Sequence, residues 1–337
     1  MSTAETTATP VPDPAGRPAP SRWSRVALVV GGLCAVLLVM LTAFALPSVK
    51  SSPQDVPVAI VGPDQQVATI EDSIDQAAPG ALDLVTAADA DAAEQMILDR
   101  EVYGAFVLGQ DGVTVQTASA ASYSVASMLT QASQQLGASA GVQVTVEDVV
   151  PLPEDDPRGV GLTAGSLPLA IGGLLAAAAC IALLHGPTRR IAGAAGFALV
   201  GGFALTAVLQ YGFGTFDGPY ALTALAASLG IGATSMLVLG LERLLGAPGI
   251  AVGAVIVVLL GNPLSGITTA PEYLPQPWGA VGQLLPPGAM DTLLRNVAYF
   301  DGAASLGPIL VLCGWIVIGL VLFAAGVARS RRSGTEL

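Results

Sequence analysis

The chain has 337 residues, of which 53% are hydrophobic and only 11% are charged, and its formal net charge is −12. A soluble domain carries about 25% charged residues, so this composition excludes an ordinary soluble protein and indicates one embedded in a membrane. The acidic balance also excludes nucleic acid as a natural partner, because like charges repel.

Residues 1–24 open the chain with a segment rich in Thr, Pro and Ala that shows no apolar period. Such a segment cannot bury enough surface to offset the entropy of ordering it. We therefore expect a disordered tail, placed in the cytoplasm by the charge distribution described below.

A first transmembrane helix is expected at residues 25–47, because the apolar run 26–46 is long enough to cross a hydrocarbon layer. A secretory signal is the alternative, since Ala43, Phe44 and Ala45 form a cleavage-like site after an apolar stretch. The run of 21 residues exceeds the core of a typical signal, which favours an uncleaved anchor. Both interpretations place the following segment outside the cell.

Residues 50–158 are expected to form an extracellular α/β domain. Val-rich runs bounded by Gly, Pro or Asp predict strands at 56–62, 82–87, 102–109, 113–118 and 142–150. Helical segments at 64–77, 88–100 and 121–137 alternate with them, and Asp89 is placed to cap the second helix. The domain holds seventeen of the 25 acidic residues against three basic ones, which keeps it soluble.

The domain ends in three consecutive acids, Glu154, Asp155 and Asp156, before Pro157. A hard cation needs six or more oxygens arranged around it, so a solvated linker is the better interpretation than a calcium site. We expect no metal and no cofactor.

Residues 159–328 are expected to form a bundle of five further spans, followed by a cytoplasmic tail at 329–337. The apolar windows are 160–184, 191–213, 219–241, 244–261 and 304–328. They are rich in Gly, Ala and Ser, residues that allow close packing of helices. Cys34, Cys180 and Cys313 all fall within predicted spans, so the external domain has no disulfide framework.

The positions of the basic residues predict a protein of the cell (plasma) membrane with both termini in the cytoplasm. Lys and Arg near span ends resist translocation, and this topology leaves nine inside and four outside. The inner set is Arg17, Arg22, Arg25, Arg189, Arg190, Arg243, Arg329, Arg331 and Arg332, and the outer set is Lys50, Arg100, Arg158 and Arg295.

The segment between the last two spans is predicted to be a re-entrant hairpin at 263–302, entered from outside. Six prolines forbid one continuous span, yet the segment is too apolar for a free loop. Two short helices are expected, at 277–285 and 289–300, with a break at Pro286, Pro287 and Gly288. In the second, Asp291 and Arg295 are spaced to pair across one turn.

Irregular backbone at membrane depth is tolerated only against protein or a wet cavity, so the hairpin should cap the bundle. The alternative is a helix pair lying on the lipid surface, with Trp278, Tyr299 and Phe300 as aromatic anchors.

The chain resembles the permease subunits of type 2 ABC exporters, particularly actinobacterial ones and the phage-infection-protein branch. The resemblance rests on the order of spans, the external domain opening with "VPVAIVG" (56–62), and three sequence words. These are "VYGAFVL" (102–108), "GNPLSG" (261–266) and "LPPGAMDTLLRNVAYFDG" (285–302), within a likeness that covers about residues 25–328.

The resemblance implies a dimer of this permease, or a heterodimer with a similar one, that exports an apolar or amphipathic substrate. A separate ABC ATPase would drive it, and the chain holds no G-x-x-x-x-G-K-[ST] loop of its own. His185, Arg189, Arg190 and Arg243 are candidate contacts with that ATPase, although positive-inside anchoring with an interfacial histidine is the favoured explanation. The loop between the second and third spans is shorter than the family uses for coupling.

A non-transporting membrane protein, whose external domain binds a partner or cell-wall component, is the alternative function. An ion-coupled transporter is disfavoured because no span carries a charge. Gln210, Ser228 and Thr234 are the candidate pathway residues, although Ser and Thr in spans usually bond their own helix. Catalysis is not expected, because the one histidine lies at the cytoplasmic edge.

The topology predicts that a cysteine introduced near residue 110 is labelled by an impermeant thiol reagent in intact cells. A cysteine at residue 187 should stay unlabelled until the membrane is opened, and the parent chain serves as the control. The opposite pattern would reverse the topology.

Overall fold

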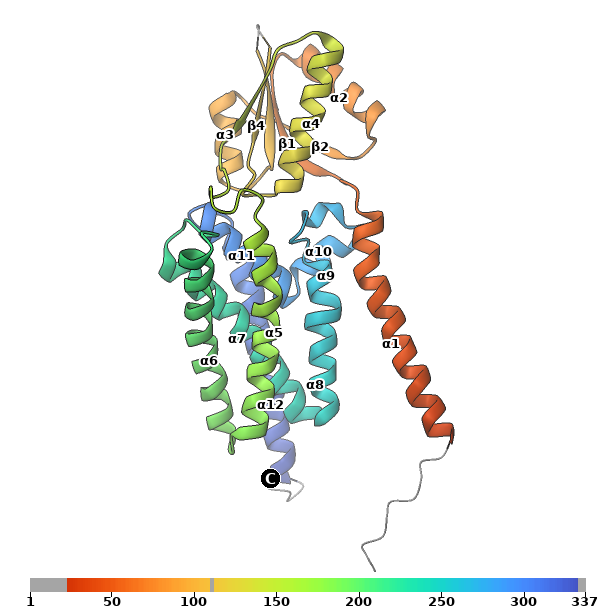
Figure 1. Cartoon of the computed structure of the whole chain (residues 1–337), viewed down its shortest axis with the longest axis vertical. Helices are drawn as coiled ribbons and strands as arrows, with labels where there is room; N and C mark the ends of the chain where they lie inside the picture. Colours follow the sequence, from red (N-terminus) through yellow and green to blue (C-terminus); the bar gives the residue numbers. More distant parts are fainter. Residues whose placement is uncertain (1–22, 110–111, 333–337) are drawn as a thin grey trace, which may run out of the picture. The chain divides into compact units, whose positions relative to one another are not determined.

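The computed structural model describes residues 23–109 and 112–332. It divides into two compact units, one ending at Thr42 and the other running from Ala43, and each is described by itself (Figure 1). The tail expected at residues 1–24 lies outside the described residues, except for Trp23 and Ser24. These two residues begin helix α1 (Trp23–Lys50), whose part up to Thr42 is long and apolar enough to cross a membrane.

The second unit begins with a five-stranded sheet in the order β2-β1-β3-β4-β5. Strands β1 (Val56–Val61), β2 (Leu82–Thr86), β3 (Gly104–Leu108), β4 (Val113–Thr117) and β5 (Val144–Asp148) confirm all five strand predictions. β3 and β4 pair antiparallel, whereas β1 pairs parallel with β2 and β3, and β4 pairs parallel with β5.

The helices of this α/β domain provide the crossovers that its parallel pairs require. They are α2 (Asp64–Ala77), α3 (Ala90–Leu98) and α4 (Tyr123–Ala140), close to the predicted ranges. Asp89 caps α3 as predicted, because its carboxylate accepts a 2.8 Å hydrogen bond from the amide of Ala92. The Ser122 hydroxyl caps α4 in the same way.

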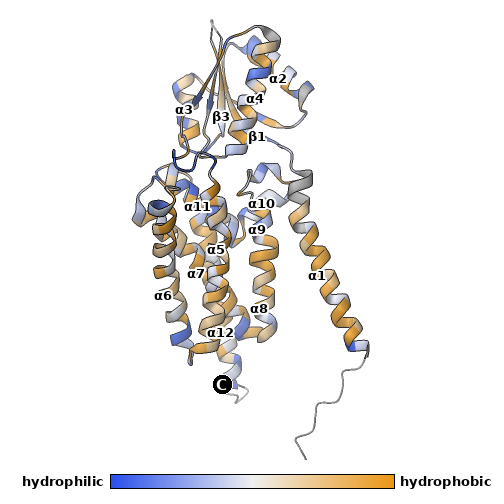
Figure 2. Cartoon of the chain, viewed as in Figure 1, coloured by the Kyte–Doolittle hydropathy of each residue, from blue (hydrophilic) through white to orange (hydrophobic). Residues whose placement is uncertain are grey.

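Six helices in the described residues are long and apolar enough to cross a membrane, and their positions match the six predicted spans. After α1 they are α5 (Val160–Leu183), α6 (Pro187–Ala207), α7 (Tyr220–Leu245), α8 (Ala247–Ala254) and α12 (Leu306–Arg332). α6 continues into the π-helix η1 (Val208–Gly212), and α8 continues into η2 (Val255–Gly261) and α9 (Asn262–Leu264). Apolar residues dominate these helices, as Figure 2 shows.

Helix α7 is the most buried of the six, because small residues let its neighbours approach its backbone. At Gly240, an added Cβ would overlap the carbonyl of Gly319 on α12. At Gly319, an added Cβ would overlap the backbone of Met236 on α7. The two helices therefore meet backbone to backbone.

The segment between the last two spans folds as the 3₁₀ turn η3 (Pro271–Tyr273), α10 (Trp278–Gln283) and α11 (Pro286–Tyr299). The expected break at Pro286, Pro287 and Gly288 is wrong by a few residues, because the chain turns at Leu284 and Leu285. The prolines instead start α11, where a missing N–H costs nothing and the fixed φ suits a helix.

Helix α11 is buried on most of its circumference rather than on one face. It packs against α7, α12 and α5. Met290, Leu293 and Leu294 are at most 2% exposed. This burial is unlike that of a helix lying on a lipid surface.

The α/β domain and the bundle are joined through the segment 265–274. Four groups of the domain side donate hydrogen bonds to carbonyl oxygens of this segment. The bonds run from Ser51, Gln54, Ser122 and Ser124 to the carbonyls of Tyr273, Glu272, Thr269 and Thr268, respectively. Ala270, Tyr273 and Phe300 also belong to the same hydrophobic core as the sheet.

The acidic run at 154–156 has a structural part in this junction. The two carboxylate oxygens of Asp156 accept hydrogen bonds of 2.8 and 2.7 Å from the amides of Val160 and Gly161. Asp156 therefore satisfies orphan donors at the first turn of α5, a role that a solvated linker would not have.

The contact between α7 and α12 predicts that Gly319→Val lowers the free energy of unfolding by about 1–3 kcal/mol, because the new side chain meets backbone that no rotamer change can move. The midpoint of thermal unfolding in detergent measures this. Gly314→Val is the matched control on α12, where an added Cβ meets nothing within 4 Å. Equal losses in the two variants would contradict the predicted contact.

Candidate functional site

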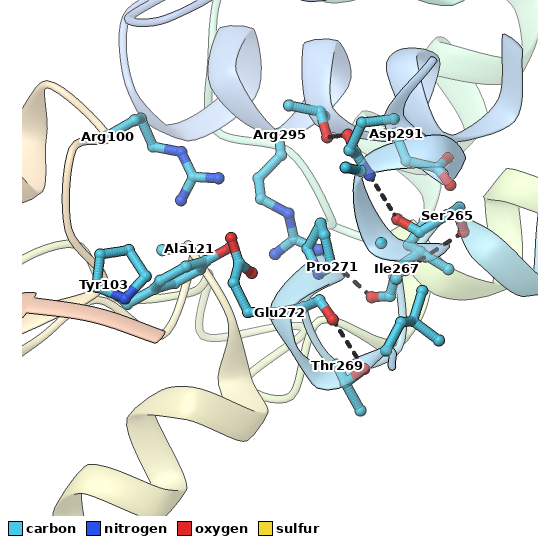
Figure 3. Close-up of a pocket in the computed structure, with 18 of the residues that line it drawn as sticks. Arg100, Tyr103, Ala121, Ser265, Ile267, Thr269, Pro271, Glu272, Asp291 and Arg295 are labelled. Atoms are coloured by element: carbon cyan, nitrogen blue, oxygen red, sulfur yellow. Dashed lines mark hydrogen bonds between the residues drawn. The ribbon is translucent and has the colours of Figure 1, made fainter. Parts of the chain in front are cut away.

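A cavity of about 430 Å³ lies where the α/β domain meets the segment 265–274, α10 and α11 (Figure 3). Most of its lining comes from three places: the turn after α3, the segment itself, and the faces of α10 and α11. This volume is within the range of about 300–1,000 Å³ that small-molecule sites occupy. The lining includes Arg100, Tyr103, Glu272, Asp291 and Arg295.

Arg100 follows α3 with a left-handed backbone (φ 64°), which turns the chain toward β3. Its Nε donates a 3.1 Å hydrogen bond to the side-chain oxygen of Asn296 on α11. The guanidinium carbon lies 4.7 Å from the ring centroid of Phe300 and 5.6 Å from that of Tyr103. Both distances are within the range of cation–π attraction, so the side chain is fixed from two sides.

Tyr103 connects the domain to the segment 265–274 through its hydroxyl, which donates a 2.8 Å hydrogen bond to Oε2 of Glu272. Burial, and then the charge of Glu272, raises the pKa of Tyr103 far above its usual range. The phenol is therefore a permanent donor at physiological pH.

Arg295 extends from α11 into the same cavity. Its two terminal nitrogens donate hydrogen bonds of 2.9 Å to the carbonyl of Ala120 and 3.5 Å to that of Ile267. The predicted pairing of Arg295 with Asp291 is wrong, since no hydrogen bond or ion pair joins them among the described residues. The helical spacing permits the pair, but backbone carbonyls across the cavity compete for the guanidinium.

Asp291 is 2% exposed, and neither oxygen of its carboxyl group accepts a hydrogen bond among the described residues. Burial raises the pKa of Asp291 to about 7, against the opposing effects of Ser166, Arg295 and Ser265. The residue lies on α11, outside the six membrane-length helices. A carboxyl group in this position changes its protonation near neutral pH.

The other predicted hairpin residues lie on α10 and α11 but do not line the cavity. Trp278 begins α10 and is 45% exposed. Pro286 and Pro287 are buried at the start of α11, and Gly288 is pressed against the carbonyl of Gly282. Any larger residue at Gly288 would separate α10 from α11.

The predicted cytoplasmic contacts lie together at the far end of the bundle from the sheet. Arg190 is engaged within the chain: it lies 3.6 Å from Glu242 and donates to the carbonyls of Leu184 and Ile181. Arg243 is half-buried, whereas His185 and Arg189 are exposed. These last two are the side chains that remain accessible to a partner.

The three predicted pathway residues are not brought to one place. Gln210 donates to the carbonyl of Gly218 at 2.9 Å. The Ser228 hydroxyl donates to the carbonyl of Ala224, one turn back on its own helix, as sequence reasoning anticipated for Ser in a span. Thr234 is buried against Gly173 of α5.

Sequence reasoning missed four residues that build the cavity: Arg100, Tyr103, Glu272 and Asn296. One feature of the sequence singles out Arg100: it is one of only three basic residues in an acidic domain. No local pattern, however, connects Arg100 with Asn296, which lies 196 positions away.

Comparison with family models, curated proteins and solved structures finds no match to this chain.

The buried carboxyl of Asp291 predicts a pH-dependent cost to stability. Because its folded pKa of about 7 exceeds the ordinary 3.8, the folded state loses stability progressively as the pH rises from about 4 to about 7. Asp291→Asn removes the charge, so its advantage in unfolding temperature over the parent should grow from pH 5 to pH 7 and then level off.

The control is Asp301→Asn, an exposed carboxylate just after the same helix. Its difference from the parent should not vary with pH in this way. An Asp291→Asn variant whose difference from the parent does not change between pH 5 and pH 7 would contradict the raised pKa of Asp291.

Proposed function

We propose that this chain is the permease subunit of an ATP-driven exporter, with both termini cytoplasmic and the α/β domain outside the cell. The observation that carries the proposal is the burial of α11. It has 14 residues, too few to cross a membrane, yet it packs against three membrane-length helices. A short helix that caps a bundle is the arrangement that the resemblance to type 2 ABC exporters implies.

The surface next to this cap supports the proposed substrate class. α7 and α11 bound a mainly apolar hollow of about 270 Å³, lined by Leu222, Leu225, Leu229, Leu293 and Val297. The hollow and the polar cavity share no lining residue and lie on different faces of α11, so the hollow by itself suits an apolar molecule or an acyl chain. This supports export of an apolar or amphipathic substrate.

The energy source must be a separate subunit if transport is driven by ATP. The sequence has no phosphate-binding loop, and its one lysine is Lys50. His185 and Arg189 are the exposed side chains at the expected ATPase-facing end, so they are the proposed contact points. The working unit would contain two permease chains and two ATPase subunits.

A non-transporting membrane protein is the second candidate, and one observation favours it. α5 and α6 are joined by only Leu184, His185 and Gly186, and α7 and α8 by only Gly246. These short connections offer little surface for an ATPase to bind. In this case the α/β domain would carry the function by binding an envelope component.

Affinity purification of the tagged chain from its native membrane in mild detergent tests the proposal. A subunit that contains a phosphate-binding loop and hydrolyses ATP should copurify in about equal amount. Arg189→Glu should reduce its recovery several-fold, because it reverses an exposed charge at the proposed contact. Arg158→Glu, an exposed arginine next to the α/β domain, is the matched control.

Repeated purification without such an ATPase would contradict the proposal and favour the envelope-binding protein. Recovery of the ATPase that falls equally in both arginine variants would place its contact elsewhere.

A further inference from the structure

The cavity at the junction holds two arginine side chains without an acidic partner. Within residues 23–109 and 112–332, no carboxylate lies within 4.0 Å of the guanidinium of Arg100 or Arg295. Three acids also line the cavity, Glu101, Glu272 and Asp291, and of these Glu272 accepts a hydrogen bond from Tyr103. Two half-buried cations left without a counter-ion are costly unless an anion joins them.

Figure 3 shows both guanidiniums extending into the same space, whereas the carboxyl group of Asp291 points away from Arg295. The two charges affect each other: after burial, which lowers the pKa of Arg100 most, the charge of Arg295 lowers it further. A shared anion would remove this repulsion.

The arginines also keep hydrogen-bond donors available. Only Nε of Arg100 donates to a described protein group, which leaves both of its terminal nitrogens free to bind a ligand. Arg295 is held in place by two carbonyls, one on each side of the cavity. Both guanidinium groups are thus held in place before a ligand binds, which lowers the entropic cost of binding.

We propose that this cavity binds a phosphate group, with Arg100 and Arg295 donating to different oxygens of the same anion. A carboxylate offers two oxygens, which one guanidinium can satisfy alone, whereas a phosphate monoester offers three and more charge. The volume of about 430 Å³ far exceeds the roughly 30 Å³ that one water occupies, so the site has room for the group to which the phosphate is attached.

Val102, Ile267, Leu274 and Ala280 provide apolar wall next to the arginines. A phosphate with an organic substituent therefore fits the cavity better than the free ion. Both a lipid headgroup and a soluble phosphate ester carry this chemistry. The proposal does not depend on transport, because the site is complete within one chain.

The test measures binding to the purified full chain in a neutral, phosphate-free detergent at constant ionic strength. The probes are glycerol 3-phosphate, as the soluble ester, and dihexanoyl phosphatidic acid, which has the same headgroup with short acyl chains. Succinate is the carboxylate probe. Saturable binding of at least one phosphate probe, at least tenfold tighter than succinate, is expected.

Arg100→Gln and Arg295→Gln should each weaken phosphate binding at least tenfold, and the double variant should abolish it. Arg331→Gln, which removes an exposed charge near the end of α12, should bind like the parent. If Arg295→Gln fails to fold, the two variants Arg100→Gln and Arg100→Lys still test the proposal. Arg100→Lys keeps the positive charge but loses the planar guanidinium group.

Binding of both phosphate probes supports a soluble ester as the ligand, and binding of phosphatidic acid alone supports a lipid. No binding of either probe overturns the proposal, as does equal binding by the double variant. Succinate that binds as tightly as the phosphate probes overturns the choice of phosphate. None of these results depends on whether an ATPase copurifies.

Discussion

The need to pair backbone carbonyls in the segment 265–274 governs the junction of this protein. The segment is neither helix nor strand over most of its length, so its own backbone satisfies only some of its polar groups. Side chains, and the backbone amide of Gln54, satisfy others. The carbonyls of Ser265 and Ile267 accept from Gln283 and Arg295, and four more accept from the domain side. The same hydrogen bonds hold the α/β domain on the bundle and shape the cavity.

Arg295 shows how this constraint overrides a local pattern. Its spacing from Asp291 satisfies the rule for a helical ion pair, yet its guanidinium bonds to carbonyls of Ala120 and Ile267. Unpaired carbonyls away from water cost more than a helical pair on one turn contributes, about 0.2–0.5 kcal/mol. Asp291 is left buried without a hydrogen bond among the described residues, and this burial raises its pKa.

The sequence alone predicted the elements well and their contacts poorly. Long apolar runs predict spans and Val-rich segments predict strands, because spans and strands both depend on the burial of residues that are close together in the sequence. The start of α11 at Pro286 was misplaced because Pro both ends and begins helices, and the sequence does not distinguish the two. The pair formed by Arg100 and Asn296 had no local signature, since only the fold brings α3 and α11 together.

The seam between α7 and α12 limits how this bundle could move. Where Gly240 meets Gly319, the backbones leave no space for a side chain, a lipid tail or water. Sliding one helix along the other would drive neighbouring side chains into main-chain atoms. These two helices therefore form a rigid pair, and any rearrangement of the bundle has to leave this seam intact.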